Sequence, residues 1–116
     1  MELTKHGNNA NIKINVLPEK EMRALGFTDY REGYWYFRKI LYEGCDISFD
    51  LTVNKTDPSD WYIDVLLDDF CQPYDYPCLM MSYVPFAFEI RDKVEEIMRW
   101  LTDQGIVEGW KEGDYI

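Results

Sequence analysis

Four aspartates near the middle of the chain come closest to a chemical site: Asp64, Asp68, Asp69 and Asp75. Carboxylate oxygens are the ligands that Mg²⁺ and Ca²⁺ prefer, so these residues could hold a hard cation. However, the chain contains no Asp-x-Asp-x-Asp-Gly loop, and the spacing of the four follows no metal-binding pattern. We therefore favour a solvated acidic edge and keep a metal-dependent hydrolase as a remote alternative.

Nucleophilic catalysis lacks its usual partners in this chain. His6 is the single histidine and lies in a polar N-terminal segment, so it is a poor candidate for the base of a Ser–His or Cys–His pair. Cys45 follows Gly44 in a turn between two acidic residues, whose negative charge disfavours a thiolate. We therefore predict no catalytic residue, no cofactor and a protein that is not an enzyme.

The three cysteines indicate neither a disulfide framework nor a zinc site, because their number is odd and no CxxC pair occurs. Cys71 and Cys78 are close enough in sequence for a bridge, yet reduced and buried thiols are the favoured interpretation. The N-terminal segment MELTKHGNNAN is polar, and no stretch approaches the ~20 apolar residues that a membrane span needs. These features predict a cytoplasmic protein without a membrane partner.

The negative charge of the chain is concentrated in one window. The formal net charge is −10, and residues 43–75 hold nine acidic residues against the single Lys55, a net of −8. Nucleic-acid binding needs a basic footprint that replaces counterions on the phosphates. The charge distribution therefore argues against direct binding of nucleic acid.

The elements that must position these acidic residues follow from the hydrophobic pattern. Aromatic residues predict a strand over Tyr34–Tyr42, and strict alternation of apolar and polar residues predicts two more over 47–53 and Trp61–Leu67. Short connections between the three require an antiparallel meander. A short strand and a short helix, the latter ended by Gly26, precede the meander. The predicted ranges are a strand over 12–16, a helix over 19–25, and meander strands over Tyr34–Tyr42, 47–53 and Trp61–Leu67.

The hydrophobic pattern after the meander is less regular. Three prolines in 68–85 indicate an ordered loop, with 78–83 as a candidate fourth strand. From Phe86 the apolar residues recur at helical spacing, which predicts a helix over 86–104 that ends at Gly105 with a hydrophobic contact from Ile106 or Val107. The acidic tail, 108–116, is expected to fray or to pack, and residues 1–10 to be flexible.

These elements predict a single α+β domain over residues 1–116. Its two layers are an antiparallel meander of three to four strands and the C-terminal amphipathic helix that covers one face, with a short N-terminal helix beside them. The other face of the sheet is then expected to point to solvent. It would carry Ser48, Asp50, Thr52, Tyr62, Asp64 and Leu66.

Asp50 and Asp64 would then lie on the polar face of adjacent strands. Same-face residues along a strand are about 6.6 Å apart, which is the scale on which a nucleic-acid backbone presents its charges. One interpretation is a surface shaped for a basic partner protein, such as the nucleic-acid-binding groove of another protein. The other is solubility and protection against edge-to-edge pairing. The predicted binding residues are Asp50, Asp64, Asp68, Asp69 and Tyr62.

The chain also resembles small uncharacterised proteins of bacteriophages and prophages of Gram-positive bacteria. The resemblance lies in LGFTDYREGYWYFRKI (residues 25–40), DISFDLTV and DPSDWYIDVLLDDFCQPYDY, within residues 22–76. It implies a phage-encoded accessory protein, a class that includes inhibitors of host defence nucleases, and it carries over no functional residue. A structural protein that forms a homo-oligomer through a tyrosine-rich sheet face or edge is the main alternative.

Overall fold

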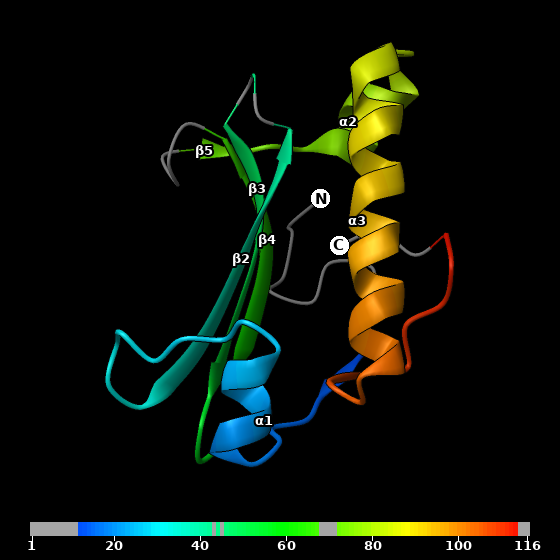
Figure 1. Ribbon diagram of the computed structural model, residues 1–116. Helices are drawn as coiled ribbons and strands as arrows, with labels where there is room; N and C mark the ends of the chain where they lie inside the picture. Colours follow the sequence, from blue (N-terminus) through cyan, green and yellow to red (C-terminus); the bar gives the residue numbers. More distant parts are fainter. Residues whose placement is uncertain (1–11, 43, 45, 68–71, 114–116) are drawn as a thin grey trace.

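The computed structural model describes residues 12–42, 44, 46–67 and 72–113. The chain forms an α+β fold in which a four-stranded antiparallel sheet stands beside a long C-terminal helix (Figure 1). No helix in these described ranges is long and apolar enough to cross a bilayer. The predicted fold class, a meander covered by a C-terminal helix, is confirmed.

The sheet has the order β2-β3-β4-β5, and every neighbouring pair is antiparallel. Short connections leave no room for a crossover, so consecutive strands become neighbours. A bulge interrupts the register of β2 and β3 between Ile40 and Tyr42. The bounds are β2 Tyr34–Tyr42, β3 Ile47–Asn54, β4 Trp61–Leu67 and β5 Gln72–Pro73.

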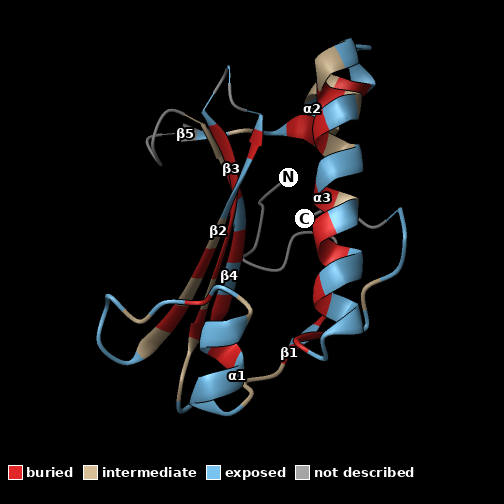
Figure 2. Cartoon of the chain, viewed as in Figure 1, coloured by how far each residue is buried: buried red, intermediate tan, exposed pale blue. Residues whose placement is uncertain are grey.

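The core lies between the sheet and α3 (Pro85–Asp103), as the buried residues on their facing sides show in Figure 2. Alternation along the strands turns one set of apolar side chains to the helix, and Phe49, Leu51 and Val53 of β3 are completely buried there. The helix contributes the stripe that its spacing predicts, namely Ala87, Ile90, Val94, Ile97, Met98 and Leu101.

The N-terminal strand is shorter than predicted and lies outside the main sheet. β1 (Lys13–Ile14) pairs with β6 (Val107–Glu108) in a separate two-stranded sheet. The backbone N–H of Asn15 also donates to the carbonyl of Ile106 at 2.8 Å. The part of the predicted tail that is described therefore packs, while 1–10 and 114–116 lie outside the described residues.

The predicted fourth strand over 78–83 is wrong. This segment lies mostly in the helix α2 (Tyr76–Met81), and the fourth strand of the sheet is the shorter β5. The side chain of Asp75 caps α2 by accepting from the backbone N–H of Cys78 at 3.1 Å, and Pro77 lies in the first turn. The sequence contains two signals of a helix start, Asp75 as a cap and Pro77 in the first turn. The apolar run 78–81 led instead to the prediction of a strand.

The three helices in the described ranges end in the same backbone motif. After α1 (Glu19–Ala24) and α3, a glycine with positive φ follows the cap residue. The backbone N–H of the residue after that glycine donates to a carbonyl five residues earlier. Phe27 donates to Met22 and Ile106 donates to Leu101, which is the Schellman pattern. The predicted stops at Gly26 and Gly105 are confirmed. After α2 the same position is occupied by Tyr83, with a φ of 57°.

Candidate functional site

The sheet face that points away from α3 carries most of the predicted site residues. We call it the polar face and define it by Tyr36, Arg38, Ser48, Asp50, Tyr62 and Asp64. The antiparallel register places Arg38 opposite Asp50 and Asp50 opposite Asp64, so that three charged residues form one row across β2, β3 and β4. Directly opposed residues lie on the same face, so these side chains can interact.

Asp50 is buried, contrary to the prediction that it points to solvent. Its exposed fraction is 4%. The hydroxyl groups of Tyr36 and Ser48 both donate to its carboxylate, the latter at 2.6 Å, and the Nε of Arg38 lies 3.9 Å away. A buried carboxylate is tolerated when donors and a cation surround it. Asp50 is therefore an internal acceptor and is removed from the set of exposed binding residues.

Asp64 differs from Asp50 although the two are opposite each other. It is exposed as a residue, and its side chain has no hydrogen bond or ion pair with any residue that the structure describes. The chain around its carboxyl group limits hydration, which raises the pKa of Asp64, and the charge of Asp50 raises it further. Asp64 is thus a carboxylate without a neutralising neighbour in the described chain.

The tyrosine hydroxyl beside Asp50 is held in its protonated form. Burial raises the pKa of Tyr36 strongly, and its hydrogen bond to Asp50 and the negative charge of that carboxylate raise it further. The ring of Tyr30 contacts Tyr36 edge to face, with 5.2 Å between ring centroids. The hydroxyl therefore serves as a donor to Asp50.

Three other aspartates of the 43–75 window have local structural roles. Asp57 accepts from the backbone N–H and the hydroxyl of Ser59. Asp60 accepts from the Tyr34 hydroxyl at 3.2 Å, and Asp75 caps α2. Aspartates favour such turn and cap positions because the side chain bonds nearby backbone groups. Turn and cap chemistry therefore accounts for part of the acidic excess.

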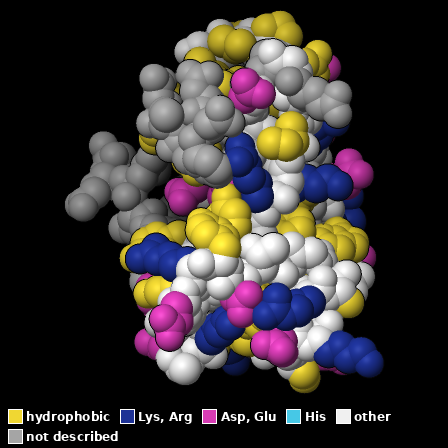
Figure 3. Space-filling view, turned by 60° about the vertical axis from the view of Figure 1, so that its left-hand side comes forward, with side chains coloured by type: hydrophobic (Ala, Val, Ile, Leu, Met, Phe, Trp, Pro, Cys, Tyr) yellow, Lys and Arg dark blue, Asp and Glu magenta, His cyan; other side chains and the backbone are white. Residues whose placement is uncertain are grey.

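The charge on this side of the molecule is mixed. Figure 3 shows Lys and Arg side chains interspersed with Asp and Glu over the lower part of the view. Asp29 pairs with both Arg23, at 2.8 Å, and Lys55, at 2.9 Å, and these contacts lower the pKa of Asp29. Both cations also lie against the ring of Trp35, at 5.1 and 4.2 Å from its centroid. This cluster lies around Trp35, whose side chain points to the opposite face of β2 from that of Tyr36.

Of the five predicted binding residues, the structure places Tyr62 and Asp64 on the exposed part of the polar face. They lie two residues apart on β4, and 46% of Tyr62 is exposed. Asp68 and Asp69 lie outside the described residues. The sequence analysis placed Ser48 on this face without predicting its contact with Asp50, and it missed the other two partners, Tyr36 and Arg38. The signal that could have found Arg38 is the hairpin register, which sets it opposite Asp50.

No protein-family model, curated protein or solved structure matches this chain.

The described residues contain no group of three or more His, Cys, Asp or Glu side chains that could hold a metal ion. Of the four aspartates considered for such a site, Asp64 lies on β4 and Asp75 caps α2. Cys78 is a free and exposed thiol, so the expectation of a buried thiol is wrong for this cysteine. Its candidate bridge partner, Cys71, lies outside the described residues, as does Cys45.

Proposed function

We propose that the protein is a non-enzymatic accessory protein of a phage or prophage that binds a basic partner protein through the polar face. The observation that carries the proposal is Asp64. It is an exposed carboxylate beside a second carboxylate, Asp50, and no described residue neutralises it. Like charges directly opposed on neighbouring strands cost stability. A basic side chain from a partner would remove that cost at the moment of binding.

Tyr62 supports the same surface. It lies on the face that carries Asp64, and 46% of the residue is exposed. Tyrosine gives contact area at low entropic cost, and an aromatic face also attracts a guanidinium or ammonium group. We therefore expect a lysine or arginine of the partner to contact Tyr62 and to pair with Asp64.

The resemblance to phage and prophage proteins suggests the setting. We propose that the protein acts in the bacterial cytoplasm and that its partner is a nucleic-acid-binding protein, which it inhibits by occupying a basic groove. The net charge of −10 favours such a partner over nucleic acid itself. Attraction between opposite charges would accelerate association and would weaken as salt screens it.

The test is capture of partners from a bacterial lysate at low salt, with identification by mass spectrometry. The wild type should retain proteins of basic isoelectric point that elute below ~0.5 M salt. The variant Tyr62→Ala/Asp64→Asn should retain about tenfold less of these proteins than the wild type, because it removes the contact area and the charge together. A partner should also lose its affinity for nucleic acid when the wild type is added.

The matched control is Tyr83→Ala/Glu89→Gln, which removes one exposed tyrosine and one acidic charge away from the polar face. It should retain the partners as the wild type does. Retention that is unchanged up to ~0.5 M salt would contradict the electrostatic basis. Equal retention by the two double variants would exclude the polar face.

A homo-oligomer is the second candidate, because a large tyrosine, Tyr62, is 46% exposed on the polar face and could pack against a second copy. Light scattering over a wide range of concentration separates the two functions. A mass that stays at one chain excludes the oligomer and leaves the proposal of a basic partner untouched.

A further inference from the structure

The described residues cover the outer edge of β2 only in part. β2 is the first strand of the order β2-β3-β4-β5, so one side of it has no strand neighbour among the described residues of the main sheet. Near its start, Thr28 bridges to Tyr36, and each residue's N–H donates to the other's carbonyl at 2.8 Å. This pair shows that the backbone of Tyr36 points outward, away from β3.

The backbone N–H and C=O of Ile40 also point outward, away from β3. Inward and outward groups alternate along an antiparallel strand, so a residue four positions after Tyr36 points the same way. No described residue forms a backbone hydrogen bond with Ile40 on the outer side. We call the part of β2 over Lys39, Ile40, Leu41 and Tyr42 the open edge. It offers a donor and an acceptor to an added strand.

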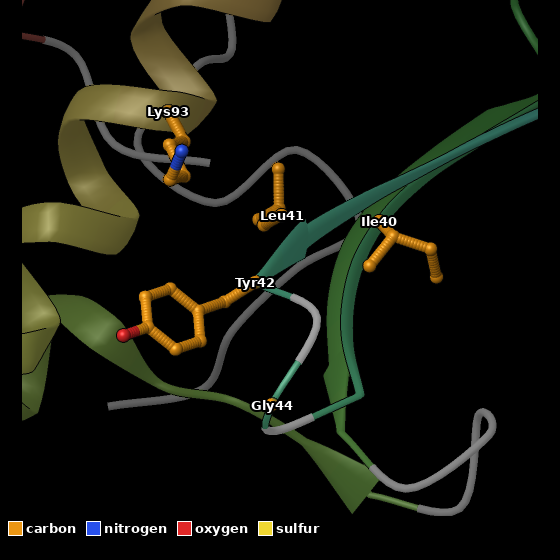
Figure 4. A pocket seen from close by; sticks show the side chains of 5 residues that line it. All are labelled: Ile40, Leu41, Tyr42, Gly44 and Lys93. Carbon is orange, nitrogen blue, oxygen red and sulfur yellow. The ribbon is translucent and has the colours of Figure 1, made fainter.

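A cavity of about 430 Å³ adjoins the open edge, between the end of β2 and α3. Figure 4 shows Lys93 of α3 lying across from Leu41, with Tyr42 on the same side and Ile40 pointing away. The ring of Tyr42 is fixed by an edge-to-face contact with Phe86, with 4.8 Å between centroids. An apolar side chain of an added strand could therefore enter beside Tyr42.

The charge at the open edge is opposite to that of the molecule. Lys39 and Lys93 are exposed, and neither has an ion pair or hydrogen bond with a described residue. The whole chain carries −10. We propose that the open edge binds an extended acidic segment of another protein by strand addition. Acidic side chains pair with Lys39 and Lys93, and the backbone of the segment bonds to Ile40.

A second copy of this chain fits the open edge poorly. Two-fold pairing of β2 with itself would bring the lysines of both edges together and leave them without opposite charge. Two molecules of net charge −10 also repel each other at low salt. Lysine on an exposed edge opposes pairing with like-charged strands, and the same charge favours an acidic strand. The inference is independent of the proposed basic partner, which uses a different surface.

The test uses a fluorescent decapeptide in which glutamate alternates with valine, and its binding is followed by anisotropy. We expect saturable binding that weakens at high salt. A peptide in which lysine replaces glutamate should bind at least about tenfold more weakly, because its charges oppose Lys39 and Lys93. In NMR spectra, the acidic peptide should shift the amide signal of Ile40 and slow its hydrogen exchange, since that N–H becomes bonded.

Two variants separate the parts of the site. Ile40→Pro removes the outward N–H while leaving the bonds to β3, and it should weaken binding about tenfold. Lys39→Glu/Lys93→Glu should weaken binding by a similar factor. Lys13→Glu/Lys20→Glu is the matched control, because it changes the net charge equally at exposed lysines elsewhere. It should keep most of the affinity.

Three outcomes would overturn the inference. The first is absence of binding of the acidic peptide to the folded wild type at millimolar concentration. The second is a set of peptide-induced shifts centred on Tyr62 and Asp64 instead of Ile40. The third is a concentration-dependent dimer that Ile40→Pro dissociates, which would assign the edge to a second copy. If Ile40→Pro unfolds, the lysine variants and the NMR map decide alone.

Discussion

At the scale of single residues, Asp50 and Asp64 show how one residue type acquires two roles. Both lie on the polar face and oppose each other on β3 and β4. Asp50 receives hydrogen bonds from Tyr36 and Ser48 and is buried, whereas Asp64 is exposed without a described partner. A buried acceptor with two donors stabilises the fold, while an unpaired carboxylate beside it costs stability.

The first prediction compares the same substitution at these two positions. Asp50→Asn should lower the free energy of unfolding by about 1–3 kcal/mol, because the neutral amide keeps one acceptor oxygen for two hydroxyl donors and loses the ion pair with Arg38. Asp64→Asn should change it by less than about 0.5 kcal/mol or raise it slightly. Urea unfolding measures both values. Similar losses at the two positions would contradict the burial difference.

The second prediction concerns pH. The pKa of Asp64 is raised in the folded state, so between its unfolded and folded pKa values the folded protein binds more protons. The contribution of Asp64 to stability is therefore lost as the pH rises from about 3.9, the ordinary pKa of aspartate. The stability of Asp64→Asn relative to the wild type should improve between about pH 3 and pH 7.

Carboxyl-carbon NMR titration measures the same effect directly. The Asp64 signal should titrate above the ordinary range of aspartate, and Asp50→Asn should lower that pKa because it removes the neighbouring charge. Asp29 is the internal reference, since Lys55 and Arg23 lower its pKa, and its contribution is lost as the pH falls through that lowered value. An Asp64 pKa that does not respond to Asp50→Asn would refute the coupling.

At the scale of elements, the helix ends show which local signals were sufficient. Gly26 and Gly105 follow α1 and α3 with φ values of 101° and 82°, and a glycine adopts that conformation without steric cost. Tyr83 has the same positive-φ conformation after α2, although it carries a side chain. That residue is 85% exposed. The backbone bonds from Tyr83 to Met80 and from Val84 to Leu79 hold it in place.

The third prediction exchanges these residue types. Tyr83→Gly should raise the stability by about 0.5–1 kcal/mol, because it relieves a left-handed conformation while losing little buried surface. Gly105→Ala should lower it by about 1 kcal/mol for the opposite reason, although no atom lies within 4 Å of the position that a Cβ would take. Thermal and urea unfolding measure both. Loss of stability on Tyr83→Gly would mean that the ring contributes contacts that outweigh the strain.

At the scale of the whole molecule, the two ends of the described chain meet in a separate small sheet. β1 pairs with β6, and Ile14, Ile106 and Val107 are almost completely buried there. These residues join the core that lies between the main sheet and α3. A pairing of two short strands has little stability of its own, so burial in the shared core must hold it.

The fourth prediction tests that dependence. Ile14→Ala should lower the free energy of unfolding by roughly 2–5 kcal/mol, the usual cost of truncating a buried isoleucine side chain to alanine. Lys13→Ala, the exposed neighbour on the same strand, should cost less than about 0.5 kcal/mol. Tryptophan fluorescence and far-UV circular dichroism should report one coincident transition. An early separate transition in the wild type would show that β1 and β6 form an independent unit.

The sequence alone determined the elements whose signal is local. Strict alternation predicted β3 and β4, aromatic content predicted β2, helical spacing predicted α3, and glycine marked two helix ends. These patterns depend on neighbours within a few residues, so a single chain displays them. The strand expected over 78–83 failed because a short apolar run fits a strand or a helix equally well.

Only the tertiary structure decided which acidic residue is exposed and which strand pairs with β1. The sequence placed Asp50 and Asp64 on one face, but whether a polar face is covered depends on groups brought from elsewhere. Asp50 is buried because Tyr36 and Arg38 reach it from the neighbouring strand, and β1 meets β6 because distant segments close on one core. Alternation specifies a direction for each side chain, while burial and pairing depend on what lies in that direction.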